Sequence, residues 1–101
     1  MALYAVSFRL DYSGDYDARY ERLINSIKLQ AAGPKYWDET TSFMLLESDL
    51  QPGPLADAII AGAHFDAKTD LLLVIYLSGK KGHALRGHYT DKDVIELLKD
   101  R

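Results

Sequence analysis

The chain has no cysteine among its 101 residues, which excludes a disulfide framework and thiolate ligands for a metal. It also lacks a strong excess of charge of one sign. The net charge of −3 argues against broad nucleic-acid binding driven by overall charge. It does not exclude binding through a local basic patch. No basic, hydrophobic leader of the secretory type precedes the first strand pattern, so we expect a cytoplasmic protein.

Long hydrophobic runs are absent as well. The longest, Leu71–Leu77, has seven apolar residues, whereas about 20 are needed to cross a bilayer, so no membrane partner is expected. A strand presents alternate side chains to opposite faces. An unbroken apolar run therefore predicts a strand that is covered on both faces, in a chain whose length suits one domain.

Hydrophobic periodicity predicts an α+β fold. The order of elements is strand, helix, strand, strand, helix, strand and terminal helix, which is the ferredoxin-like βαββαβ plan with an added C-terminal helix. We assign 1–89 to the ferredoxin-like domain and 90–101 to the helical extension. The predicted elements are a strand at Leu3–Leu10, a helix at Asp15–Ala31, a strand pair at Lys35–Thr40 and Ser42–Ser48, a helix from Pro54, a strand at Leu71–Leu77, a polar loop at Ser78–Tyr89 and a helix at Asp91–Asp100 opened by a Thr90–Asp93 capping box.

The helices of this plan cover one face of the sheet, so the doubly apolar strands leave the other face apolar. Such a face is usually an interface, and most oligomers are symmetric. We therefore predict a homodimer that packs through Phe43, Leu45, Leu73 and Ile75. The alternative is that the C-terminal helix folds back over this face within one chain.

One segment is densely basic. Gly79–His88 holds Lys80, Lys81, His83 and Arg86, and its glycines let backbone amides approach a phosphate. The segment is a candidate contact for phosphate or nucleic acid. A solvated loop leading to the last helix is the alternative interpretation.

Three carboxylates surround the first strand-to-helix turn. Oxygen ligands of this kind suit Mg²⁺, and a two-fold axis that pairs Asp11 from two subunits would create a site for phosphodiester hydrolysis. Alternatively, Asp15 caps the helix and Asp17 complements its dipole.

Short stretches of the chain resemble a known family. Tyr-Ala-Val-Ser-Phe, then Tyr-Trp-Asp-Glu-Thr-Thr-Ser-Phe-Met-Leu-Leu-Glu, then Asp-Leu-Leu-Leu-Val-Ile-Tyr-Leu-Ser-Gly-Lys-Lys-Gly resemble the small bacterial "SinR family" proteins. These look like relatives of the small subunit of the CRISPR spacer-integration complex and of VapD-type toxins. The resemblance implies a ferredoxin-like homodimer, which binds duplex DNA in the CRISPR relatives.

The resemblance also implies a nuclease acid directly after an aromatic residue at the end of the first strand. Phe8 matches the aromatic residue, but Arg9 follows it, so Asp11 would have to substitute as the metal ligand. A cation cannot bind Mg²⁺, whereas Arg9 suits a phosphate.

These observations favour a non-catalytic dimeric module that binds DNA or RNA. Its contacts would be Arg9, Lys80, Lys81, His83 and Arg86. Two alternatives are a metal-dependent endonuclease that uses Asp11 with Mg²⁺, and a protein-binding regulatory subunit of the toxin–antitoxin type.

Overall fold

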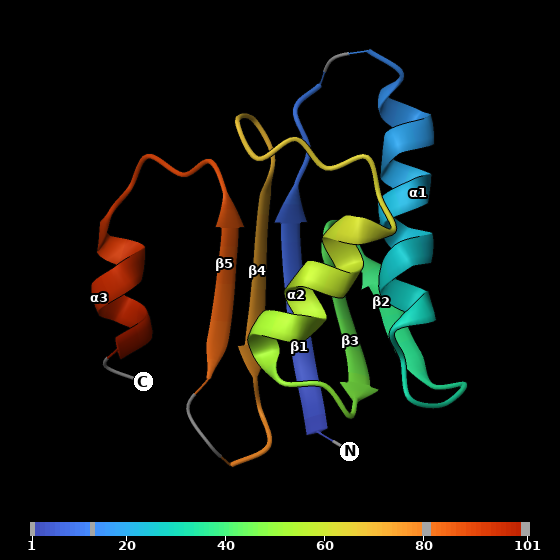
Figure 1. The fold of residues 1–101 in the computed structure, drawn as a ribbon, viewed down its shortest axis with the longest axis vertical. Coiled ribbons are helices and arrows are strands. Elements are labelled where there is room, and N and C mark those ends of the chain that lie inside the picture. Colours follow the sequence, from blue (N-terminus) through green and yellow to red (C-terminus); the bar gives the residue numbers. More distant parts are fainter. Residues whose placement is uncertain (1, 13, 80–81, 100–101) are drawn as a thin grey trace.

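The computed structural model describes residues 2–12, 14–79 and 82–99, which form one five-stranded sheet and three helices (Figure 1). Neighbouring strands are antiparallel throughout, in the order β2-β3-β1-β4-β5. This α+β arrangement is compatible with a ferredoxin-like fold. The elements are β1 (Ala2–Arg9), α1 (Tyr16–Leu29), β2 (Tyr36–Thr40), β3 (Phe43–Ser48), α2 (Pro52–Ala61), β4 (Leu71–Tyr76), β5 (His83–Gly87) and α3 (Asp93–Lys99).

Two local predictions are wrong. The polar loop expected over Ser78–Tyr89 contains β5, which pairs with β4 from Leu71↔Gly87 to Ile75↔His83. Ala84 is the one buried apolar side chain of this strand, and the sequence His-Ala-Leu-Arg-Gly has no β-branched or aromatic residue to indicate a strand. The capping box is absent too, because the carboxylate of Asp91 accepts a hydrogen bond from the Asp93 N–H at 3.0 Å and α3 begins at Asp93.

Helices α1 and α2 cover the core face of the sheet, which carries Tyr4, Val6 and Phe8 of β1 (Figure 1). Asp15 caps α1 as predicted, since its side chain accepts from the Ala18 N–H at 3.3 Å. The two helices are tied together where the Ser26 hydroxyl donates to the Ile59 carbonyl at 2.6 Å. Among the helices described here, none has the length and apolar character that a bilayer span requires.

Asp70, just before β4, is a fully buried carboxylate. Its oxygens accept hydrogen bonds from the Asp11 N–H at 2.9 Å, from the Asp66 N–H at 2.8 Å and from the Arg19 guanidinium at 2.7 Å. Burial raises the pKa of Asp70, but these hydrogen bonds and the Arg19 charge outweigh it and hold the pKa below its ordinary value. The carboxylate therefore joins β1, α1 and the loop before β4.

The backbone of Asp70 extends this junction to β5. Its carbonyl accepts from the His88 N–H at 2.7 Å. The approach is so close that a Cβ on Gly87 would overlap the same carbonyl, and Gly87 also has a φ of 102°. A glycine is therefore required where β5 ends.

Asp70→Asn removes the charge that this junction is built around. We expect the free energy of unfolding at pH 7 to fall by about 2 kcal/mol, because Arg19, which is partly exposed, loses its buried partner. The depressed pKa places this stabilisation above about pH 4, and it is lost as pH falls through the folded-state pKa. Urea unfolding at several pH values should show that the difference in the free energy of unfolding between wild type and variant becomes smaller in acid.

The matched control is Asp57→Asn, since Asp57 pairs with Arg86 at 3.2 Å with 68% of its side chain exposed. We expect that variant to lose less than about 1 kcal/mol. Equal losses in the two variants would contradict the role assigned to Asp70.

Candidate functional site

The sheet face opposite α1 and α2 is apolar, and we call it the open face. The register of the strands aligns its side chains in rows across the sheet. One row runs Phe43, Ser7, Leu73 and Leu85, and the next runs Trp37, Leu45, Ala5, Ile75 and His83. The four residues predicted to form a dimer interface lie here, each partly exposed.

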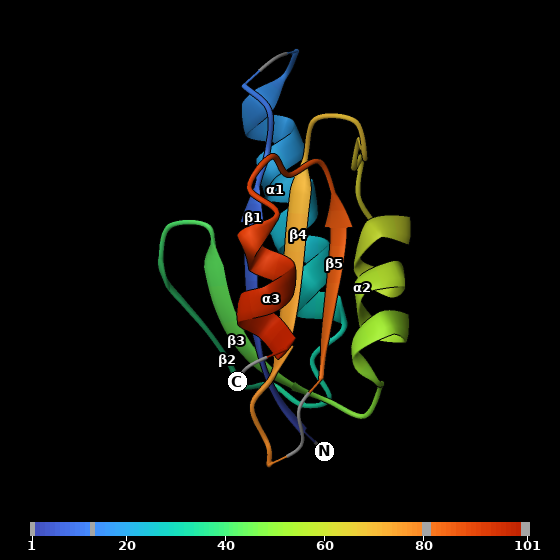
Figure 2. The ribbon, with the colours of Figure 1, turned by 90° about the vertical axis from the view of Figure 1, so that its left-hand side faces the viewer.

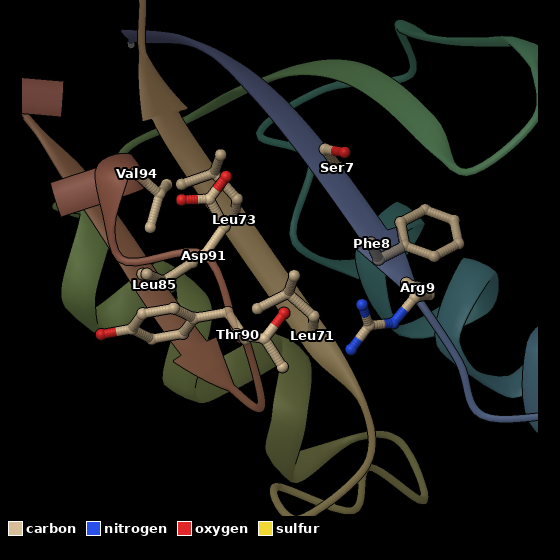
Figure 3. A pocket seen from close by; sticks show the side chains of 10 residues that line it. Ser7, Phe8, Arg9, Leu71, Leu73, Leu85, Thr90, Asp91 and Val94 are labelled. Carbon is tan, nitrogen blue, oxygen red and sulfur yellow. The ribbon is translucent and has the colours of Figure 1, made fainter. Parts of the chain in front are cut away.

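Helix α3 lies over one side of the open face, as Figure 2 shows with α2 on the opposite side of the sheet. Between α3 and the sheet is a cleft of about 310 Å³. Figure 3 shows Leu71, Leu73, Leu85 and Val94 around it, with the Arg9 guanidinium directed toward it from β1. The alternative from the sequence, in which the C-terminal helix folds back over this face, describes only part of it. The β2–β3 side of the face has a separate open hollow lined by Trp37 and other side chains.

Arg9 also borders a second, polar hollow, which we call the basin. It has a volume of about 470 Å³. The basin lies around the carboxyl end of β1 and takes residues from three parts of the chain. It is lined by Arg9, Leu10, Asp11, Tyr12, Lys68, Thr69 and His88.

The hydrogen bonds of Asp70 position this basin. The side chain of Asp70 accepts from the Asp11 N–H, and the carbonyl of Asp70 accepts from the His88 N–H. Arg19 donates to the Asp11 carbonyl at 2.9 Å, and Arg9 donates to the His88 carbonyl at 2.9 Å. Each segment that contributes a side chain to the basin is thus fixed by a hydrogen bond to a neighbouring segment.

The basin has an excess of positive charge. Arg9 and Lys68 contribute two cations against the single carboxylate of Asp11, and His88 adds a ring nitrogen that can donate a hydrogen bond. In the part of the chain that the structure describes, no ion pair engages any of these four side chains. The chemistry of this lining suits a phosphate group.

The three predicted nucleic-acid contacts that the structure describes do not lie on one surface. Arg9 lies at one end of the open face, and His83 lies four positions further along the sheet, or about 13 Å at 3.3 Å per residue. Arg86 lies on the core face, where it pairs with Asp57 of α2. Lys80 and Lys81 lie outside the described residues.

Asp11, the predicted catalytic and metal-binding residue, is exposed at the basin. Within the described ranges, no group of three or more acidic or histidine side chains is placed to hold a metal ion. Asp11 on its own therefore does not make a Mg²⁺ site, which typically needs further oxygen ligands from phosphate or water.

Sequence reasoning missed Tyr12, Lys68 and His88 as members of one site. They come from segments that are distant in the chain and meet because β1, β4 and β5 are neighbours. The signal that could have identified them is the predicted antiparallel pairing of β1 with β4, which brings the end of β1 beside the start of β4.

Comparisons of the chain with family models, curated proteins and solved structures found no match.

The attachment of α3 to the open face can be tested with Leu98→Ser. Leu98 is 8% exposed, so a hydroxyl there should loosen α3 and speed amide hydrogen exchange across 93–99 by about tenfold or more. Leu97→Ser is the matched control, because Leu97 is 69% exposed. Similar exchange rates in the two variants would mean that α3 is not held to the sheet by Leu98.

Proposed function

We propose that the chain is a homodimeric, ferredoxin-like module that binds nucleic acid through its phosphates and does not cleave it. The order β2-β3-β1-β4, with α1 and α2 on one face, supports the βαββαβ sandwich, to which β5 and α3 are additions. The observation that carries the binding proposal is the convergence of Arg9, Lys68 and His88 on one basin.

The apolar side chains of the open face support a second copy as its occupant. Two positions of β1 on this face, Ala5 and Ser7, have small side chains. The residues paired with them are larger, namely Phe43 and Leu45 on β3 and Leu73 and Ile75 on β4. A two-fold axis in the plane of this face would bring the partly exposed apolar side chains of the two copies together, which is an isologous contact.

The basin supports binding of the nucleic-acid backbone. The guanidinium and ammonium groups of Arg9 and Lys68 neutralise phosphate charge, and Arg9 offers a planar set of donors for a bidentate contact. Binding without cleavage is the simpler function here, because the single carboxylate of Asp11 lies beside two cations.

Leu45→Lys tests the dimer. The side chain is partly exposed in one copy, so the fold should tolerate the change, whereas a buried, unpaired ammonium should raise the dimer dissociation constant by about 100-fold or more. Sedimentation equilibrium of wild type and variant measures this shift. Leu29→Lys is the control, because Leu29 of α1 is 80% exposed and distant from the open face. A monomeric wild type, or a variant as dimeric as wild type, would refute the interface.

Arg9→Gln with Lys68→Gln tests the basin. We expect the affinity for labelled duplex DNA, single-stranded DNA or RNA to fall about tenfold or more. The slope of the logarithm of the binding constant against the logarithm of the salt concentration should become shallower by about 0.7 to 0.9 for each phosphate contact that is lost. Fluorescence anisotropy over a series of salt concentrations measures both, and a gel of the products, with Mg²⁺ and with EDTA, reports cleavage.

The control for this experiment is Arg86→Gln, which removes a cation that pairs with Asp57 on the core face. Its affinity and salt dependence should match wild type. If Arg86→Gln weakened binding as strongly as the double variant, the binding site would not be the basin.

A further inference from the structure

Asp11 is unexpected in a site for phosphate. Its carboxylate lines the same basin as Arg9 and Lys68 and repels an incoming anion. Within the described residues, the side chain of Asp11 makes no hydrogen bond, although its backbone N–H and carbonyl are both engaged, by Asp70 and Arg19. An exposed acceptor on a fixed backbone is well placed to receive a hydrogen bond from a bound molecule.

Tyr12 borders the basin beside Asp11 and is 86% exposed. Its ring packs against that of Tyr16, with centroids 4.7 Å apart and planes tilted by 39°. The ring is thus packed against the first residue of α1 while most of its surface faces solvent. Exposed aromatic rings of this kind stack on unpaired bases, which a duplex does not offer.

We propose that the basin holds one ribonucleotide of a single-stranded RNA and that Asp11 determines the preference for ribose. Arg9 and Lys68 contact the phosphate, the base stacks on Tyr12, and the Asp11 carboxylate accepts a hydrogen bond from the ribose 2′-hydroxyl. The 2′-hydroxyl is the group by which a protein distinguishes RNA from DNA. The volume of about 470 Å³ falls in the range of small-molecule pockets. This inference rests on the proposed function and adds its substrate class.

The test compares three single-stranded oligomers of identical sequence: RNA, DNA, and 2′-O-methyl RNA, which keeps the oxygen but lacks the donor. We expect wild type to bind RNA about tenfold more tightly than either of the others, a modest effect for a hydrogen bond to a charged group. Asp11→Ala should abolish this preference while binding persists, because the cations stay and a repulsive charge is lost. The backbone contacts of Asp11 survive in this variant, so the fold is preserved.

Asp17→Ala is the matched control, since it removes an equal charge from the first turn of α1 without altering the basin lining. It should shift all three affinities together and leave the preference for RNA intact. Equal binding of the three oligomers by wild type, or a preference that survives Asp11→Ala, would overturn the role of Asp11 and leave phosphate binding standing. Failure to bind any of the three single-stranded oligomers would overturn this inference, and failure to bind duplex DNA as well would overturn the proposed function.

Discussion

The ion pair between Asp70 and Arg19 is the interaction on which the rest of the structure depends. A fully buried carboxylate is costly unless its charge is compensated, and here two backbone N–H groups and a guanidinium supply that compensation. The same group joins the start of β4 to the end of β1 and to α1. The backbone of Asp70 adds the end of β5 through His88. A stability requirement of the core thereby fixes the geometry of an exposed basin.

Arg9 lies at the boundary between the two surfaces of the proposed module. It borders the apolar cleft under α3 (Figure 3) and also lines the polar basin. Its hydrogen bond to the His88 carbonyl holds it there. A dimer that covers the open face would therefore exclude water from one side of this guanidinium. Lower local dielectric strengthens its interaction with a phosphate, so assembly and binding are expected to reinforce each other.

The sequence was sufficient for the order of the major elements, because β1 and α1 carry clear periodicities and β3 and β4 carry continuous apolar runs. It was insufficient for β5, whose edge position requires little apolar character. It was also insufficient for the cap of α3, because Thr90 and Asp91 are both suitable acceptors and Asp91 is the one that accepts from the Asp93 N–H. Arg9 and Asp11 were identifiable from their place at the end of a strand. Lys68 and His88 were not, since only the strand order brings them there. Arg86 was misleading, because strand alternation directs it to the core face.

The apolar run of β4 shows why assembly is harder to predict than fold. A strand with both faces apolar needs cover on both, but the pattern does not identify what provides it. In this chain α1 and α2 cover one face, and the short helix α3 covers part of the other (Figure 2). The apolar side chains of β3 that α3 does not cover, Phe43 and Leu45, stay partly exposed. In the proposed dimer a second copy would cover them, since close packing of two such faces requires complementary shape.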